Sequence, residues 1–283
     1  MKIRNWPVLP SQRIRNIVPE GLSDGWGGFM KAREMIAQGQ SVIELTIGEH
    51  DIKTAPDILQ AMQRSAKDGH TGYAPVPGTQ GLREIVAAHH KTQAQVPTSA
   101  ENVLITPGAQ AALFAAHLAA CDPHDKALYI DPYYTTYPGM LRALSLNPVA
   151  IAAKASDGFQ PNGASLNAAA QGAASLLINS PNNPTGVVYG QETLEIIADT
   201  CREHDLWLIS DEVYASQVWS GRHITPRSLP GMKERSLIVG SMSKSHAMTG
   251  SRIGWVIGPE DIIDKLSDLA TVSNYGVVGF IQD

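Results

Sequence analysis

The sequence predicts an α/β fold, a three-layer α/β/α sandwich around a mostly parallel seven-stranded sheet. Two observations predict it. Short apolar runs alternate with helical stretches from about residue 100 onward, as in strands joined by crossover helices. The runs lack polar alternation, which indicates strands buried on both faces. They are VLIT (103–106), ALYID (127–131), PVAIAA (148–153), SLLIN (175–179), LWLIS (206–210), SLIVG (236–240) and RIGWVIG (252–258).

The segments between these runs are Ala-rich or amphipathic, such as QAALFAAHLAAC (110–121) and QETLEIIADTCREHD (191–205), and predict helices. The last run follows its predecessor without room for a full crossover helix, so we expect the seventh strand to be antiparallel. Binding sites in such sheets lie at the carboxyl ends of the strands.

The N-terminal part has a different pattern. Residues 1–30 predict an extended arm with a helix beginning near Asp24, and the spacing over 29–40 is helical. Residues 42–49 predict a short strand and residues 56–67 a helix. We expect residues 1–45 to form an arm and part of a small domain, and residues 46–283 to form the large domain.

Composition excludes several classes of protein. The 283 residues are 43% apolar and 17% charged, which favours a folded chain with a substantial core. The net charge of −5, without a Lys/Arg run, argues against nucleic acid as a partner. No secretory signal or run of ~18 apolar residues is evident, so we expect no membrane partner and a cytoplasmic protein.

The cysteine and histidine content points the same way. Two cysteines in unrelated contexts fit a reducing compartment and give no disulfide framework. Nine histidines show no ligand spacing, so no metal site is expected. His89 and His90 fall in a helical stretch and are expected at the surface.

A lysine follows the sixth apolar run, within SMSKSHAMTGSRIG (241–254). Lysine is rarely buried without a task, and one that forms an imine must lose its proton through desolvation or a neighbouring positive charge. Ser241, Ser243 and Arg252 supply the hydroxyl and guanidinium donors that a phosphate needs. A lone lysine would more simply be a solvated side chain, but the whole string favours a site at Lys244.

This string resembles the lysine-attachment signature of class I/II aminotransferases, which are fold-type I enzymes that use pyridoxal 5′-phosphate (PLP). The resemblance covers roughly residues 15–283. It implies that Lys244 forms a Schiff base with the cofactor and then moves a proton during catalysis. Ser241 and Arg252 would bind the cofactor phosphate, with Ser243 beside them.

A second segment, LWLISDEVY (206–214), places an Asp at the end of an apolar strand, where a charge needs a partner. A helix N-cap is the plain alternative. The segment is similar to the family's D-x-x-Y motif, which implies that Asp211 pairs with the pyridinium nitrogen of the cofactor. An ionised carboxylate keeps that nitrogen protonated. Tyr214 would reach the cofactor's O3′.

Two turns complete the expected cofactor contacts. NSPNNPTGVV (179–188) is turn chemistry taken alone, but it resembles the family's N-P-x-G motif, which implies that Asn183 bonds the O3′ and the substrate carboxylate. ITPGAQAAL (105–113) places a Gly-containing turn before a helix, where free amides face an anion. The resemblance assigns phosphate to the amides of Ala109 and Gln110; the turn lacks the usual hydroxyl or lysine.

Aromatic and glycine positions extend the resemblance. Within DPYYTTYP (131–138), Tyr134 is implied to stack on the pyridine ring, with Tyr133 and Tyr137 as alternatives. Tyr73, in a Y-x-x-x-x-G-x-x-x-L-R segment, is implied to reach the partner's site across a homodimer. Gly48, in LTIGEHD (45–51), would lie near the substrate carboxylate.

The family's chains usually continue for ~100 residues more, about one small domain, and supply an Arg that clamps the substrate carboxylate. We therefore expect a chain truncated at its C-terminus. The implied function is transamination between an L-amino acid and a 2-oxo acid, aspartate-like or of broad specificity. The alternatives are another fold-type I activity (C–S lyase or cyclopropane-forming synthase), a catalytically impaired fragment, an inactive scaffold, or the effector domain of a regulator.

Overall fold

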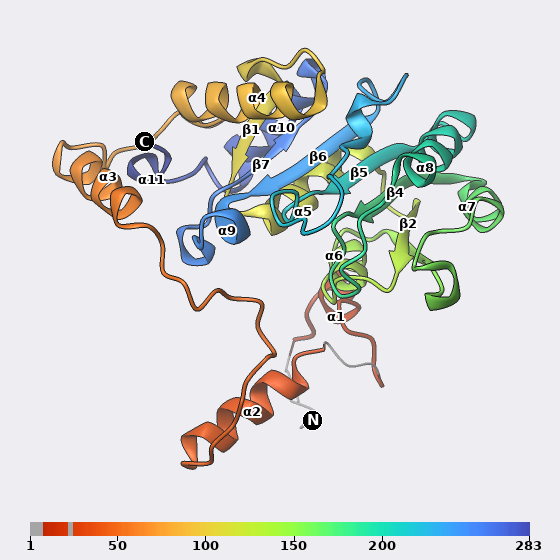
Figure 1. The fold of residues 1–283 in the computed structure, drawn as a ribbon, viewed down its shortest axis with the longest axis horizontal. Coiled ribbons are helices and arrows are strands. Elements are labelled where there is room, and N and C mark those ends of the chain that lie inside the picture. The colour runs from red at the N-terminus through yellow and green to blue at the C-terminus, as the bar shows by residue number, and fades with distance from the viewer. Residues whose placement is uncertain (1–7, 22–24) are drawn as a thin grey trace.

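A seven-stranded sheet forms the centre of the chain, with helices on both faces (Figure 1). The computed structural model describes residues 8–21 and 25–283. The strand order is β1-β7-β6-β5-β4-β2-β3, and β7 runs antiparallel to both of its neighbours. The remaining pairs are parallel. The predicted fold class and the antiparallel seventh strand are therefore confirmed.

The strands coincide with the apolar runs to within about two residues. They are β1 (Val103–Thr106), β2 (Lys126–Asp131), β3 (Asn147–Ala152), β4 (Ala173–Asn179), β5 (Trp207–Asp211), β6 (Ser236–Ser241) and β7 (Gly254–Ile257).

The helices include the two predicted crossover helices, α5 and α8. They are α1 (Gln12–Arg15), α2 (Gly27–Ala37), α3 (Pro56–Lys67), α4 (Gln80–Ala94), α5 (Ala109–Ala120), α6 (Tyr137–Ala143), α7 (Gly163–Ala170), α8 (Gln191–Glu203), α9 (Met242–Ser245), α10 (Glu260–Ser273) and α11 (Gly279–Gln282). Single 3-10 turns lie at η1 (Ala100–Asn102), η2 (Ala155–Asp157), η3 (Pro226–Ser228) and η4 (Thr249–Ser251). None of the helices in the described part of the chain has the length and apolarity needed to cross a bilayer.

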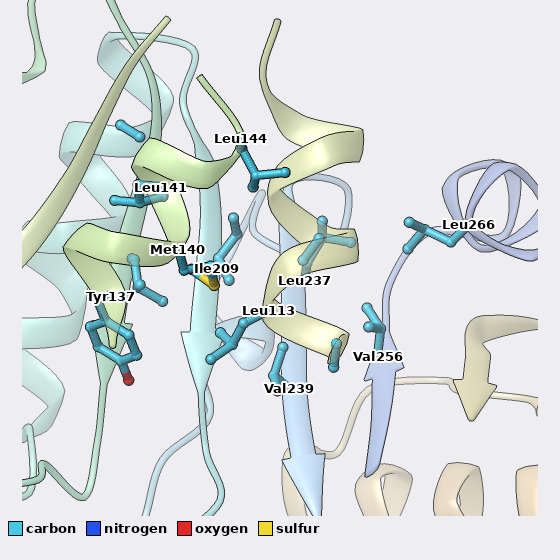
Figure 2. Close-up of a cluster of buried hydrophobic side chains, with 14 of the residues drawn as sticks. Leu113, Tyr137, Met140, Leu141, Leu144, Ile209, Leu237, Val239, Val256 and Leu266 are labelled. Atoms are coloured by element: carbon cyan, nitrogen blue, oxygen red, sulfur yellow. The ribbon is translucent and has the colours of Figure 1, made fainter. Parts of the chain in front are cut away.

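Each face of the sheet carries its own apolar core, because successive strand residues point to opposite faces. On one face, Ile209 of β5 and Leu237 of β6 pack with α5, α6 and α10 (Figure 2). On the other, Leu176 of β4 packs with α7 and α8, and Ile238 of β6 packs with α4. Burial on both faces explains why the strands have continuous apolar sequences.

The N-terminal expectations need correction. The predicted strand over 42–49 is wrong: these residues form a loop, and Ile43 and Leu45 are about 90% exposed. Alternating apolar residues form a strand only where another strand supplies hydrogen bonds. The expected extended arm contains the one-turn helix α1, and the helix expected near Asp24 begins at Gly27; Asp24 itself lies outside the described residues. Helix α3 matches the predicted range 56–67.

Candidate active site

A cavity of about 650 Å³ opens at the carboxyl ends of β4, β5 and β6, beside the N-terminus of α5. Its outer wall is formed by residues 46–49 together with Gly25, Trp26, Gly28 and Phe29. The sequence-predicted site residues that line it are Gly48, Ala109, Gln110, Tyr134, Asn183, Asp211, Tyr214, Ser241, Ser243, Lys244 and Arg252. Among the described residues, Tyr73 is the predicted site residue outside this set; it lies 90% exposed at the surface, edge-to-face with Tyr275.

Lys244 extends into the cavity from α9, the single turn that follows β6. Its Nζ donates a hydrogen bond to the carbonyl of Gly48. Burial lowers the pKa of Lys244 and the nearby Arg252 guanidinium lowers it further, while Glu49 opposes the shift. These effects make it easier for Lys244 to lose its proton and become the amine, which is the nucleophilic form.

Asp211 ends β5 and is buried, 4% exposed. Its Oδ2 accepts a hydrogen bond from the Tyr137 hydroxyl at 2.8 Å, and its Oδ1 accepts one from the Val213 amide at 3.3 Å. Burial raises the pKa of Asp211 to about 6 even though both bonds lower it. A buried carboxylate has lost much of its solvation, so it is suited to a cationic N–H partner in the cavity.

Asn183 and Tyr214 face the same part of the cavity from different loops. The side-chain nitrogen Nδ2 of Asn183 lies 3.5 Å from the Tyr214 hydroxyl. The backbone of Asn183 is fixed by a 2.7 Å bond from its N–H to Asn179 Oδ1, and Asn179 Nδ2 donates to the carbonyl of Asp211. Asn179 thus joins the ends of β4 and β5 and sets the position of Asn183 relative to Asp211.

The N-terminus of α5 forms a cradle with Arg252. Gly108, the N-cap, has φ 83° and ψ 169°, a conformation essentially restricted to glycine. A Cβ there would overlap the Arg252 guanidinium, and a Cβ at Gly254 would overlap the Gly108 backbone. These glycines let the guanidinium approach the first amides of α5, which have no partners within the helix. The combination suits a phosphate.

Two hydroxyl groups stand beside this cradle. Ser241 Oγ accepts a bond from the Ser243 amide at 2.9 Å and lies 3.0 Å from the carbonyl of Ile253. Ser243 Oγ lies 2.8 Å from Ser241 Oγ. Both side chains border the cavity, so hydroxyl, amide and guanidinium donors line the same cavity.

Several contacts around the cavity were not predicted from the sequence. Tyr137 was expected at most as a stacking ring, yet its hydroxyl bonds Asp211, while Tyr134 lies edge-to-face with it at 5.7 Å between ring centroids. Trp26 and Phe29 also line the outer wall. A tyrosine three positions beyond Tyr134 is the signal that could have identified the Asp211 contact.

Comparison with known proteins accounts for this set of residues. The model of the family described as aminotransferase class I and II matches residues 40–278. This chain belongs to that family. The match contains all six predicted site segments that line the cavity, from Gly48 to Arg252.

Curated family members align with most of this chain. The arginine–pyruvate transaminase of Pseudomonas aeruginosa is 37% identical over 259 residues, which are 91% of this chain and 66% of that protein. The aspartate aminotransferase of Bacillus subtilis is 35% identical over 255 residues, 89% of this chain and 65% of that protein. The chain therefore spans about two thirds of the length of these relatives.

Solved family structures have the same fold. The aspartate aminotransferase from Thermus thermophilus with maleate superposes with a TM-score of 0.92 at 33% identity. The aligned part covers 97% of this chain and 71% of that one. The aspartate aminotransferase of Rhizobium meliloti gives a TM-score of 0.90 at 30% identity, over 97% of this chain and 69% of that one.

Proposed function

We propose that this chain is the cofactor-binding part of a PLP-dependent aminotransferase, which moves an amino group between an L-amino acid and a 2-oxo acid. One observation carries the proposal. Lys244, with its lowered pKa, shares a cavity with the buried carboxyl of Asp211 and with the Arg252–α5 cradle. An amine, a partner for a ring nitrogen and a phosphate site are the three groups that PLP needs.

The residues present fit the cofactor. Lys244 would hold it covalently, and Asp211 would bond its ring nitrogen, replacing the solvation lost on burial. Asn183 and Tyr214 would bond its ring hydroxyl oxygen, and Tyr134 would lie against the ring. Its phosphate would accept hydrogen bonds from the cradle, that is from the amides of Ala109 and Gln110 and from the Arg252 guanidinium. The hydroxyls of Ser241 and Ser243 would donate to it as well.

The chain's own groups account for the proton movements. When bound, PLP supplies the electron sink for the negative charge left at a substrate Cα. Asp211 keeps that sink cationic because its ionised carboxylate stabilises a protonated ring nitrogen. Lys244 Nζ would be the group that takes up the substrate Cα proton and gives it back. Asn183 would also bond the substrate carboxylate, with Gly48 beside it.

We further propose a homodimer in which Tyr73 reaches the partner's site, supported by its 90% exposure outside its own cavity. The substrates named by the relatives, aspartate and arginine with pyruvate, support an aspartate-like or broad specificity. We also propose that residues 1–45 form an N-terminal arm and part of a small domain, and that residues 46–283 form the large domain.

Two free cysteines, Cys121 and Cys201, support a reducing cytoplasmic location.

Chemical trapping tests the proposal. The protein is incubated with PLP, reduced with borohydride and digested, and the labelled peptide is identified by mass spectrometry. We expect the label on Lys244 and no label in Lys244→Ala. A label on another lysine, or none in the parent protein, would refute the proposal.

A second measurement separates transamination from the lyase or synthase alternative, which would use the same Lys244 and Asp211. Protein loaded with PLP is mixed with one amino acid and no 2-oxo acid. A transaminase stops after one equivalent of oxo acid, because its cofactor has taken up the amino group. Continued release of product would identify a lyase or synthase instead.

A further inference from the structure

The main-chain carbonyl of Lys244 is held by two side chains from distant parts of the sequence. Helix α9 is a single turn, and the last carbonyls of a helix have no partners within it. The carbonyl of Lys244 instead lies 2.5 Å from His50 Nε2 and 3.2 Å from Gln217 Nε2. His50 is 194 positions away along the chain and Gln217 is 27 positions away.

The chemistry of a carbonyl fixes the role of each side chain. A carbonyl oxygen only accepts, so both nitrogens must donate to it. His50 therefore carries its proton on Nε2, and Gln217 presents its NH2 group. The two nitrogens lie 3.5 Å apart as neighbours around one shared acceptor.

The segment that carries His50 is joined to the lysine loop at further points. Lys244 Nζ donates to the carbonyl of Gly48. Thr249 Oγ1 donates to Glu49 Oε1 at 2.6 Å, and Thr54 Oγ1 donates to the carbonyl of Ala247 at 2.6 Å. Bonds at positions 48, 49, 50 and 54 thus fix one segment against the loop of Lys244, while Gln217 fixes the loop from the side of β5.

We propose that His50 and Gln217 are positioning residues for Lys244. They hold its main chain from two sides, so that the flexible side chain moves from a fixed point and Nζ stays over the cavity. Lysine has four rotatable side-chain bonds, and any movement of its backbone would add to the entropy that must be lost before reaction. This inference rests on the proposed function, because it assumes that Lys244 is the residue that reacts with PLP.

The test measures how fast cofactor-free protein captures PLP. Capture is followed by absorbance, and the label is then located by borohydride reduction and peptide mapping. His50→Leu and Gln217→Leu each remove one donor, and each is expected to slow capture on Lys244 by about tenfold, the effect of losing one hydrogen bond. His50→Gln, which can donate from a side-chain amide, is expected to recover most of the rate. His89→Leu replaces an exposed histidine on α4 and should leave the rate unchanged.

Thermal unfolding of each variant separates positioning from general loss of structure. The inference requires slower capture in a variant whose unfolding midpoint matches that of the parent. If His50→Leu fails to fold, Gln217→Leu and His50→Gln carry the same test. Parent-like capture in both leucine variants, or failure of His50→Gln to recover the rate, would overturn it. If the parent itself labels elsewhere, the proposed function fails first.

Discussion

At the scale of single residues, Asp211 combines burial with an acidic group. Its pKa is raised from 3.8 to about 6 by burial. A carboxyl whose folded pKa exceeds its unfolded value binds protons more tightly when folded, so its ionisation destabilises the folded chain as the pH rises through 6. The difference corresponds to about 3 kcal/mol above pH 6.

Asp211→Asn is expected to separate stability from function. The variant keeps one oxygen to accept from Tyr137, loses the acceptor of the longer Val213 bond and loses the charge. Without PLP it should therefore be more stable than the parent at pH 8, by up to about 3 kcal/mol. The gap should narrow by pH 5. Urea unfolding at both pH values measures it. The same variant should capture PLP on Lys244 yet lose most turnover, and equal urea midpoints at pH 8 would contradict the burial argument.

Eleven residues predicted from the sequence line the cavity. Lys244 and Asp211 are unusual residue types where they stand, and most of the others follow from the family resemblance. Asp211 ends one apolar strand and Lys244 stands in the turn after another, and strand ends meet at one sheet edge. The contacts between them and their neighbours could not be predicted in the same way. The bond of His50 to the Lys244 carbonyl depends on how a loop lies across the sheet, and nothing local signals it. His90, expected at the surface, is 5% exposed, because it lies on the side of α4 that faces the sheet.

At the scale of elements, strands in the sheet were predictable and the 42–49 segment was not. Strands buried on both faces have continuous apolar sequences that few other structures require. Residues 42–49 carry an alternating apolar pattern, but in the described structure no strand lies beside them to complete hydrogen bonding. Pairing is a property of two segments, so one segment's pattern predicts it poorly.

The junction of β1, Gly108 and α5 gives a prediction at this scale. Gly108→Ala should destabilise the protein by about 1–3 kcal/mol, because its backbone conformation is essentially restricted to glycine. The new Cβ also displaces Arg252. The free energy of PLP binding should therefore weaken by more than the free energy of unfolding falls. Gly81→Ala is the control: Gly81 lies within α4 with open space around it, and alanine should be neutral or slightly stabilising. Urea unfolding and PLP titration measure both variants, and unchanged PLP affinity in Gly108→Ala would contradict the cradle.

At the scale of the whole molecule, the two cores each bury a histidine as well as apolar side chains. His117 on α5 and His90 on α4 both have their pKa lowered from 6.5 to about 4, chiefly by burial. A histidine with a lowered folded pKa must stay neutral, so stability is lost as the pH falls below 6.5. Each contributes about 3 kcal/mol between pH 6.5 and 4. Together the two histidines outweigh Asp211, which acts in the opposite direction, so these three groups should make the folded chain less stable in mild acid.

His117 offers the sharpest test of this balance. It is fully buried, its Nδ1 donates to the carbonyl of Leu113 at 2.8 Å, and its Nε2 has no partner among the described residues. His117→Leu removes the titrating group from the core. Between pH 7.5 and 5 the parent should lose about 2 kcal/mol through this residue that the variant keeps. Urea midpoints at the two pH values measure the difference, with His89→Leu as an exposed control. Parallel pH dependence in the parent and in His117→Leu would show that acid stability is decided elsewhere in the chain.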